Sequence, residues 1–199
     1  MISDTTEPTQ SLSSIQGLIV IDCWERPELG AFYQRLQDHV DPTQFDSIMV
    51  ANYELALDST DLCQHNTLEV YSWETYTPSM LLPMVKESRS RKTSTWLQSK
   101  FSTNSFLILD ADSLVHHCTT AVPHITNWLV IGGNWQVCMH GRPLGFHKLK
   151  TLPYNFYITP NGLYNAKKSH WLGDVDDLHN DQLTWIDQGN GLYKLKNQE

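Results

Sequence analysis

The feature that most constrains the fold is a strand–helix–strand pattern in the first third of the chain. Residues 18–22, LIVID, are a short apolar and β-branched run of the kind found in a strand covered on both faces. A helix is predicted over 27–40, where Pro27 suits the first turn and apolar residues recur at helical spacing. A second strand is predicted over 47–52. Such units favour a parallel sheet with helices on its faces.

The same alternation continues toward the C-terminus. The further predicted elements are strands at 67–73, 106–109, 128–131 and 155–159 and a helix at 112–122. We therefore predict an α/β fold, a three-layer sandwich with a largely parallel central sheet. Residues 15–199 are expected to form a single domain, and 1–14 a polar N-terminal tail without periodicity.

The tetrapeptide NGLY occurs twice in the C-terminal part of the chain, at 161–164 and at 190–193. Asn-Gly is the strongest short sequence pattern for a β-hairpin, because both residues tolerate positive φ. We predict a hairpin or a tight turn at each copy.

Charge and hydropathy exclude several classes of partner. No apolar run approaches the roughly 20 residues that a bilayer-spanning helix needs, so we expect no membrane insertion. The N-terminal residues have neither a basic start nor an apolar core, which predicts no secretory signal and a cytoplasmic location. The net charge of -8 argues against binding to a nucleic-acid backbone, since such binding depends on clustered Lys and Arg.

The cysteines predict free thiols in place of disulfides or zinc ligands. Cys23, Cys63, Cys118 and Cys138 are widely spaced, and no CxxC pair is present. A chain of this length also needs no disulfide to stabilise its core. We expect no structural metal site and no cofactor.

The segment 128–145 carries the strongest indication of chemistry. An apolar strand runs into Gly132-Gly133, where a sharp turn is predicted, and Cys138 follows close to the expected start of a helix. Ligands of open α/β sheets bind at the carboxyl ends of strands. Free backbone N–H groups around Asn134 to Cys138 would stabilise a thiolate and an oxyanion there. The alternative is that Cys138 is a small buried hydrophobic residue.

A carboxylate is expected at the same edge of the sheet. Asp22 ends the first predicted strand, and a carboxylate at that position can orient or deprotonate a thiol. The alternative is that Asp22 caps the helix that begins near Pro27. The two interpretations stand equally at this point.

The chain resembles the isochorismatase-like, or cysteine hydrolase, superfamily at three positions, Asp22, Gly132 and Cys138. That family has an Asp at the end of strand one and a nucleophilic Cys six residues after a Gly that closes a later strand, as in LVIGGNWQVC. The closest match to its third member, a Lys, is Lys100 in KFSTNSF. The resemblance implies metal-independent cleavage of a C–N or vinyl-ether bond in a small molecule, and a homo-oligomer.

Two tryptophans depart from the family pattern. Trp24 stands where the family usually has Gln, and Trp135 stands where it usually has Thr, three residues before the Cys. Two indoles at the rim of the site would fill or reshape the pocket. Trp24, Asn134 and Trp135 are therefore the expected substrate-binding residues. The alternative function is a catalytically degenerate binding or interaction protein of the same fold.

A weaker alternative involves Asp110 and Asp112, which follow the strand predicted at 106–109. Two carboxylates at this spacing can hold Mg²⁺ for transfer chemistry. Asp112 and Ser113 also suit the N-cap of the following helix, and we favour that role. In addition, if the strand at 106–109 is the one that ends at the third catalytic position, Asp110 stands there in place of Lys100 and the triad is abolished, with Lys100 a surface residue.

Overall fold

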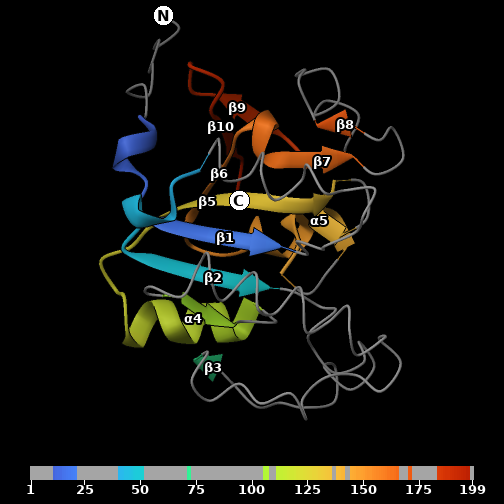
Figure 1. The fold of residues 1–199 in the computed structure, drawn as a ribbon. Helices are drawn as coiled ribbons and strands as arrows, with labels where there is room; N and C mark the ends of the chain where they lie inside the picture. The colour runs from blue at the N-terminus through green and yellow to red at the C-terminus, as the bar shows by residue number, and fades with distance from the viewer. Residues whose placement is uncertain are drawn as a thin grey trace, which may run out of the picture.

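The apolar runs of the sequence become the strands of one mixed β-sheet (Figure 1). The computed structural model describes residues 11–21, 40–51, 71–72, 105–107, 111–135, 138–141, 144–165, 170–171 and 183–197. The strands are β1 (Gly17–Ile21), β2 (Ser47–Ala51), β3 (Tyr71–Ser72), β4 (Ser105–Leu107), β5 (Asn127–Asn134), β6 (Asn155–Ile158), β7 (Leu163–Asn165), β8 (His170–Trp171), β9 (Trp185–Asp187) and β10 (Tyr193–Leu195). Their order is β3-β4-β2-β1-β5-β6-β10-β9, with β7 beside β5 and β8 beside β7.

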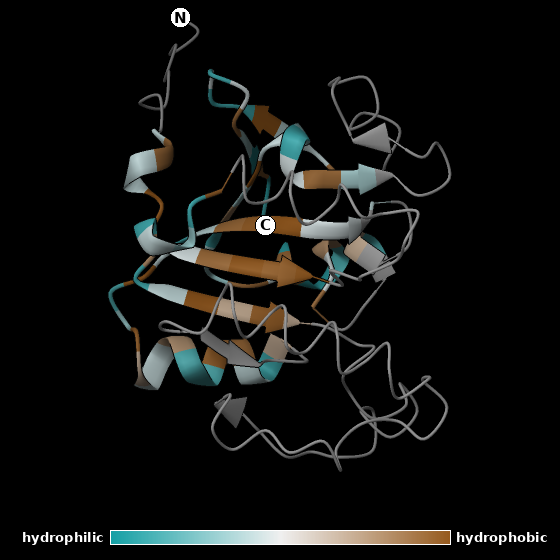
Figure 2. Cartoon of the chain, viewed as in Figure 1, coloured by the Kyte–Doolittle hydropathy of each residue, from teal (hydrophilic) through white to brown (hydrophobic). Residues whose placement is uncertain are grey.

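The centre of the sheet is parallel. Strand β1 pairs in parallel with β2 and β5, β2 with β4, and β5 with β6. All five residues of β1 and of β2 are buried, as continuous apolar runs predict for strands covered on both faces. Figure 2 shows the hydrophobic colour concentrated on β1, β2 and β5. The apolar runs therefore predicted β1, β2 and their parallel pairing correctly.

The margins of the sheet are antiparallel, so the prediction of a largely parallel sheet was wrong there. Strand β3 runs antiparallel to β4, β8 to β7, and β10 to both β6 and β9. Strands that follow each other through a tight turn can pair only in antiparallel fashion, whereas parallel neighbours need a long crossover. The described C-terminal strands are short, and β9 and β10 are joined by such a turn.

The two NGLY copies have different structures. The copy at 190–193 joins β9 to β10 as a hairpin, with φ of 54° at Asn190 and 72° at Gly191, as predicted. The copy at 161–164 contains a short 3-10 helix, η5 (Pro160–Gly162), that leads directly into β7. Both β6 and β7 run parallel to β5, so this copy is a tight turn that keeps the direction of the chain.

The described helices are short. They are η1 (Leu12–Ser14), η3 (Pro42–Gln44), α4 (Ala111–Thr120), α5 (Cys138–Gly141), α6 (Phe146–Leu149) and η5. Helix α4 confirms the helix predicted at 112–122, but it begins earlier, which puts Asp112 and Ser113 in its first turn and not at the N-cap. The helix predicted at 27–40 lies outside the described residues except for Val40, which is not helical. The three-layer arrangement stays a prediction.

One hydrophobic core extends from Ile15 to Leu195 and includes residues of the sheet, of α4 and of α6. Helix α4 contributes Leu114 and Cys118, which are buried. At the N-terminus, η1 is an exposed turn capped by the Ser11 side chain, and residues 1–10 lie outside the described part. None of the helices in the described part is long and apolar enough to cross a membrane.

Candidate functional site

The candidate site lies where the carboxyl ends of β1 and β5 meet. The two strands lie side by side (Figure 1) and pair in parallel, with Ile21 opposite Gly132. Among the parallel strands, the chain proceeds outward from β1 through β2 to β4 and then returns to the other side of β1 at β5. Such a switch point between neighbouring strands is the general ligand-binding position of open α/β sheets.

Gly132 allows β5 to approach the end of β1 very closely. Its φ is 145°, and a Cβ atom at this position would overlap the carbonyl oxygen of Ile21 and lie 2.8 Å from the carbonyl carbon. The sharp turn predicted at Gly132-Gly133 is absent, because β5 continues to Asn134 through a register shift in its pairing with β7. The positive φ of Gly132 therefore accompanies the register shift inside β5, and the chain turns only at Trp135.

Cys138 is the first residue of α5, as its expected place near a helix start predicted. Helix α5 packs against β5 and α6, so this turn of helix lies over the end of β5 (Figure 1). Asn134 is the last residue of β5 and precedes the turn. Asp22 is the next residue after β1, but Asp22, Trp24 and Lys100 lie outside the described residues.

Trp135 lies in the core and not at the rim where sequence reasoning expected it. Its side chain is only 1% exposed. Its ring is 5.6 Å from that of Phe146 and 5.9 Å from that of Trp185. Its backbone N–H donates a 2.7 Å hydrogen bond to the carbonyl oxygen of Tyr164 on β7. The indole therefore fills space beside the segment that leads to Cys138.

We call the four rings of Trp135, His140, Phe146 and Trp185 the aromatic clamp. The centroid of the His140 ring lies 4.8 Å from that of Trp135 and 6.3 Å from that of Phe146, both edge to face. The centroids of Phe146 and Trp185 are 5.1 Å apart. Sequence reasoning did not find this cluster. Trp185 is far from α5 along the chain, and only the packing of the C-terminal hairpin brings it there.

The direction of β4 bears on the third predicted position. Strand β4 is parallel to β2, so the chain enters it at the amino edge of the sheet and leaves it toward the carboxyl edge. Lys100 precedes β4 in the sequence, whereas Asp110 follows it. Both residues lie outside the described part, so the choice between them stays a prediction.

Cys118 is a free thiol of a different kind. It is buried on α4, and burial raises the pKa of its thiol to about 12, a shift that a hydrogen bond with Tyr154 opposes. The thiolate is the reactive form of cysteine, so a thiol with this pKa is unreactive near neutral pH. Cys118 thus behaves as a core residue.

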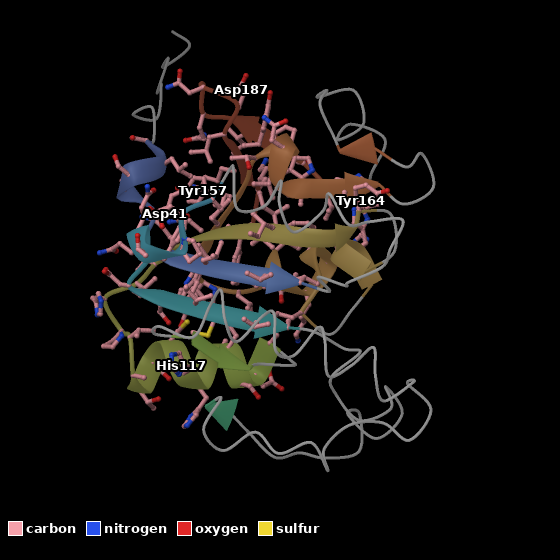
Figure 3. The ribbon with its side chains drawn as sticks, viewed as in Figure 1. Asp41, His117, Tyr157, Tyr164 and Asp187 are labelled. Carbon is pink, nitrogen blue, oxygen red and sulfur yellow. The ribbon has the colours of Figure 1, made fainter. Side chains whose placement is uncertain are left out.

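His117 on α4 is also buried, and Figure 3 shows it on this helix, below β2 in that view. Burial, followed by the neighbouring His116, holds the pKa of the His117 ring below its ordinary value. The ring is therefore neutral at pH 7. No group of three or more His, Cys, Asp or Glu side chains within the described ranges is arranged to hold a metal ion.

Comparison of the chain with protein-family models, with curated proteins and with solved structures finds no match.

Proposed function

We propose that this chain is an isochorismatase-like cysteine hydrolase that acts on a small molecule, with Cys138 as nucleophile and Asp22 as its base. The observation that carries the proposal is the register of Ile21 with Gly132. This register brings the end of β1, which Asp22 follows, next to the end of β5, from which the chain turns into α5 at Cys138. The proposal includes the family's three-layer fold, a cytoplasmic location and association into a homo-oligomer.

In the proposed reaction, Asp22 accepts the thiol proton and the Cys138 thiolate attacks a carbonyl or related electrophilic carbon. Backbone N–H groups between Asn134 and Cys138 stabilise the oxyanion of the tetrahedral intermediate. For a C–N bond, the protonated carboxyl then gives its proton to the leaving amine as the bond to carbon breaks, which leaves a thioester on Cys138. Water, deprotonated by the same carboxylate, hydrolyses the thioester and restores the thiol.

The third member of the site stays open between Lys100 and Asp110. A Lys would stabilise the thiolate by its charge, whereas an Asp would disfavour the thiolate through like-charge repulsion and abolish the triad. The proposed chemistry needs no metal ion or cofactor in either case.

A second candidate function is a binding protein of the same fold without chemistry. The observation that favours this function is the burial of Trp135. Its large indole stands where the isochorismatase-like family usually has a Thr, a small hydroxyl residue beside the nucleophile. Such a protein would bind a small molecule or a protein partner and would retain Cys138 only as a packing residue.

Turnover with and without the Cys138 thiol separates the two functions. A screen of amides, vinyl ethers and nucleotides should identify ligands by thermal shift, since a ligand that binds only the folded state raises the melting temperature. We expect Cys138→Ala to abolish turnover of the wild-type substrate while it keeps the ligand-induced shift, and Asp22→Asn to lose most of the turnover.

Cys63→Ala is the matched control, because it removes a thiol that the proposal assigns no role, and its turnover should equal that of the wild type. Turnover that persists in Cys138→Ala contradicts the hydrolase mechanism. Ligand shifts without turnover in the wild type would favour the binding protein.

A further inference from the structure

Helix α5 is too short to fix its own position. It spans four residues, Cys138–Gly141, and isolated helices shorter than about 12 residues are marginal in water because nucleation is costly. Packing against other elements must therefore determine where this turn of helix lies. Any precise placement of Cys138 depends on those contacts.

The aromatic clamp supplies such contacts from both sides of α5. Trp135 stands just before the segment and Phe146 just after it, at the start of α6. Trp185 of β9 touches both rings, at 5.9 Å and 5.1 Å between centroids. One side chain from the C-terminal hairpin thus joins the two ends of the segment that contains α5.

The third contact comes from α5 itself. The ring of His140 packs edge to face against Trp135, with an interplanar angle of 85°, and contacts Phe146 at 83°. Edge-to-face pairs are a preferred geometry of aromatic rings, because the positive edge of one ring meets the negative face of the other. Helix α5 therefore packs, through His140, against Trp135 and Phe146, the two rings that Trp185 also contacts.

We infer that Trp185 is a positioning residue for Cys138, acting through Trp135, Phe146 and His140. The inference rests on the proposed role of Cys138 as a nucleophile. Trp185 is buried, and its ring contacts Trp135 and Phe146, which flank α5 on either side. Loss of the large ring at position 185 frees the segment 135–146 to move and so disturbs the environment of the thiol.

The indole N–H of Trp185 offers a conservative variant. The Nε1 atom is buried without a hydrogen-bond partner among the described residues. A buried donor without an acceptor is unfavourable, so its removal costs nothing in hydrogen bonding. Trp185→Phe keeps an aromatic ring for the clamp and removes this donor, whereas Trp185→Leu removes the aromatic contacts.

The test compares the wild type, Trp185→Phe, Trp185→Leu and Leu114→Ala in the full chain. Leu114 is a fully buried residue of α4 outside the clamp, so Leu114→Ala controls for loss of stability alone. The rate of Cys138 alkylation by iodoacetamide is measured from about pH 6 to pH 9, a range that brackets the ordinary thiol pKa of about 8.5. Amide hydrogen exchange over 138–149 is measured in the same four proteins.

We expect Trp185→Leu to slow Cys138 alkylation about tenfold near pH 6.5, as a thiol pKa raised by about one unit would do. Exchange over 138–149 should accelerate in this variant. The Cys138 alkylation rate and the exchange over 138–149 should both stay near the wild-type values in Trp185→Phe and in Leu114→Ala. An unchanged pH profile and exchange rate in Trp185→Leu, or an equal change in Leu114→Ala, would overturn the inference.

The hydrogen-exchange measurement keeps this inference distinct from the proposed function. If Cys138 of the wild type reacts no faster than the other thiols, the nucleophile proposal fails. In that case, faster exchange over 138–149 in Trp185→Leu alone still supports the inference that Trp185 fixes the position of this segment. Equal exchange in all four proteins contradicts that inference.

Discussion

Gly132→Ala is expected to destabilise the protein by about 3 kcal/mol or more, the range in which backbone strain and overpacking combine. The new Cβ atom would overlap the carbonyl oxygen of Ile21, and the φ of 145° is one that L-residues rarely adopt. The obstructing atoms belong to the backbone of β1, a buried central strand that is paired on both sides, so they cannot move away easily. Urea denaturation followed by circular dichroism measures the loss.

Gly191→Ala is the matched control for this substitution. Gly191 also has a positive φ, of 72°, but a Cβ atom there would have nothing within 4 Å. Only the conformational cost remains, which is about 1–2 kcal/mol for a residue other than Gly in the left-handed region. Equal stability of Gly132→Ala and Gly191→Ala would contradict the close approach of β5 to β1.

Trp135→Thr is expected to cost about 3–5 kcal/mol, as large-to-small substitutions of buried aromatic residues do. Sequence analysis placed Trp135 at the rim of a binding pocket, as an indole that fills or reshapes it. The structure instead predicts a void among Phe146, Trp185 and His140, because the indole is buried and packed against all three rings. The midpoint and slope of denaturant unfolding measure the effect.

The control for Trp135 is Trp135→Phe, which keeps an aromatic ring in the clamp. It should lose less than half as much stability as Trp135→Thr, because a smaller volume is removed. Wild-type stability in Trp135→Thr, combined with a new spectrum of ligands in the thermal-shift screen, would show that position 135 lines an open pocket.

The central sheet and α4 could be predicted because their burial patterns appear in the local sequence. The run GLIVI of β1 is buried throughout, and the apolar positions of α4 recur at helical spacing. The antiparallel margins could not be predicted in the same way. Strand β9 has three residues, of which only Trp185 is buried, and three residues are too few to show a period.

The sequence predicted the approximate place of Cys138 but not the packing of the side chains around it. Cys138 is the first residue of a helix, close to where the sequence indicated a helix start, whereas Gly132 lies inside β5, which continues to Asn134. The burial of Trp135 was missed, because it depends on contacts with Trp185 and Phe146 that no local pattern encodes. A lone Trp after a glycine pair looks the same in sequence whether it lines a pocket or fills a core.

The direction of β4 bears on a choice that the sequence left open. Lys100 and Asp110 lie on either side of the strand predicted at 106–109, and from the sequence alone either could belong to the site. The parallel pairing of β4 with β2 shows only that the chain leaves β4 toward the carboxyl edge of the sheet, since Lys100 and Asp110 both lie outside the described residues. Such pairing depends on the whole sheet and is not visible in the segment itself.

The most direct test of the account is the order in which the four thiols react. Limiting iodoacetamide at about pH 6.5, below the ordinary thiol pKa of about 8.5, followed by peptide mapping, labels the thiol with the largest thiolate fraction first. We predict that Cys138 is labelled first and that Cys118, whose pKa burial raises to about 12, is labelled last. Equal or faster labelling of Cys23, Cys63 or Cys118 would contradict the assignment of Cys138 as the nucleophile.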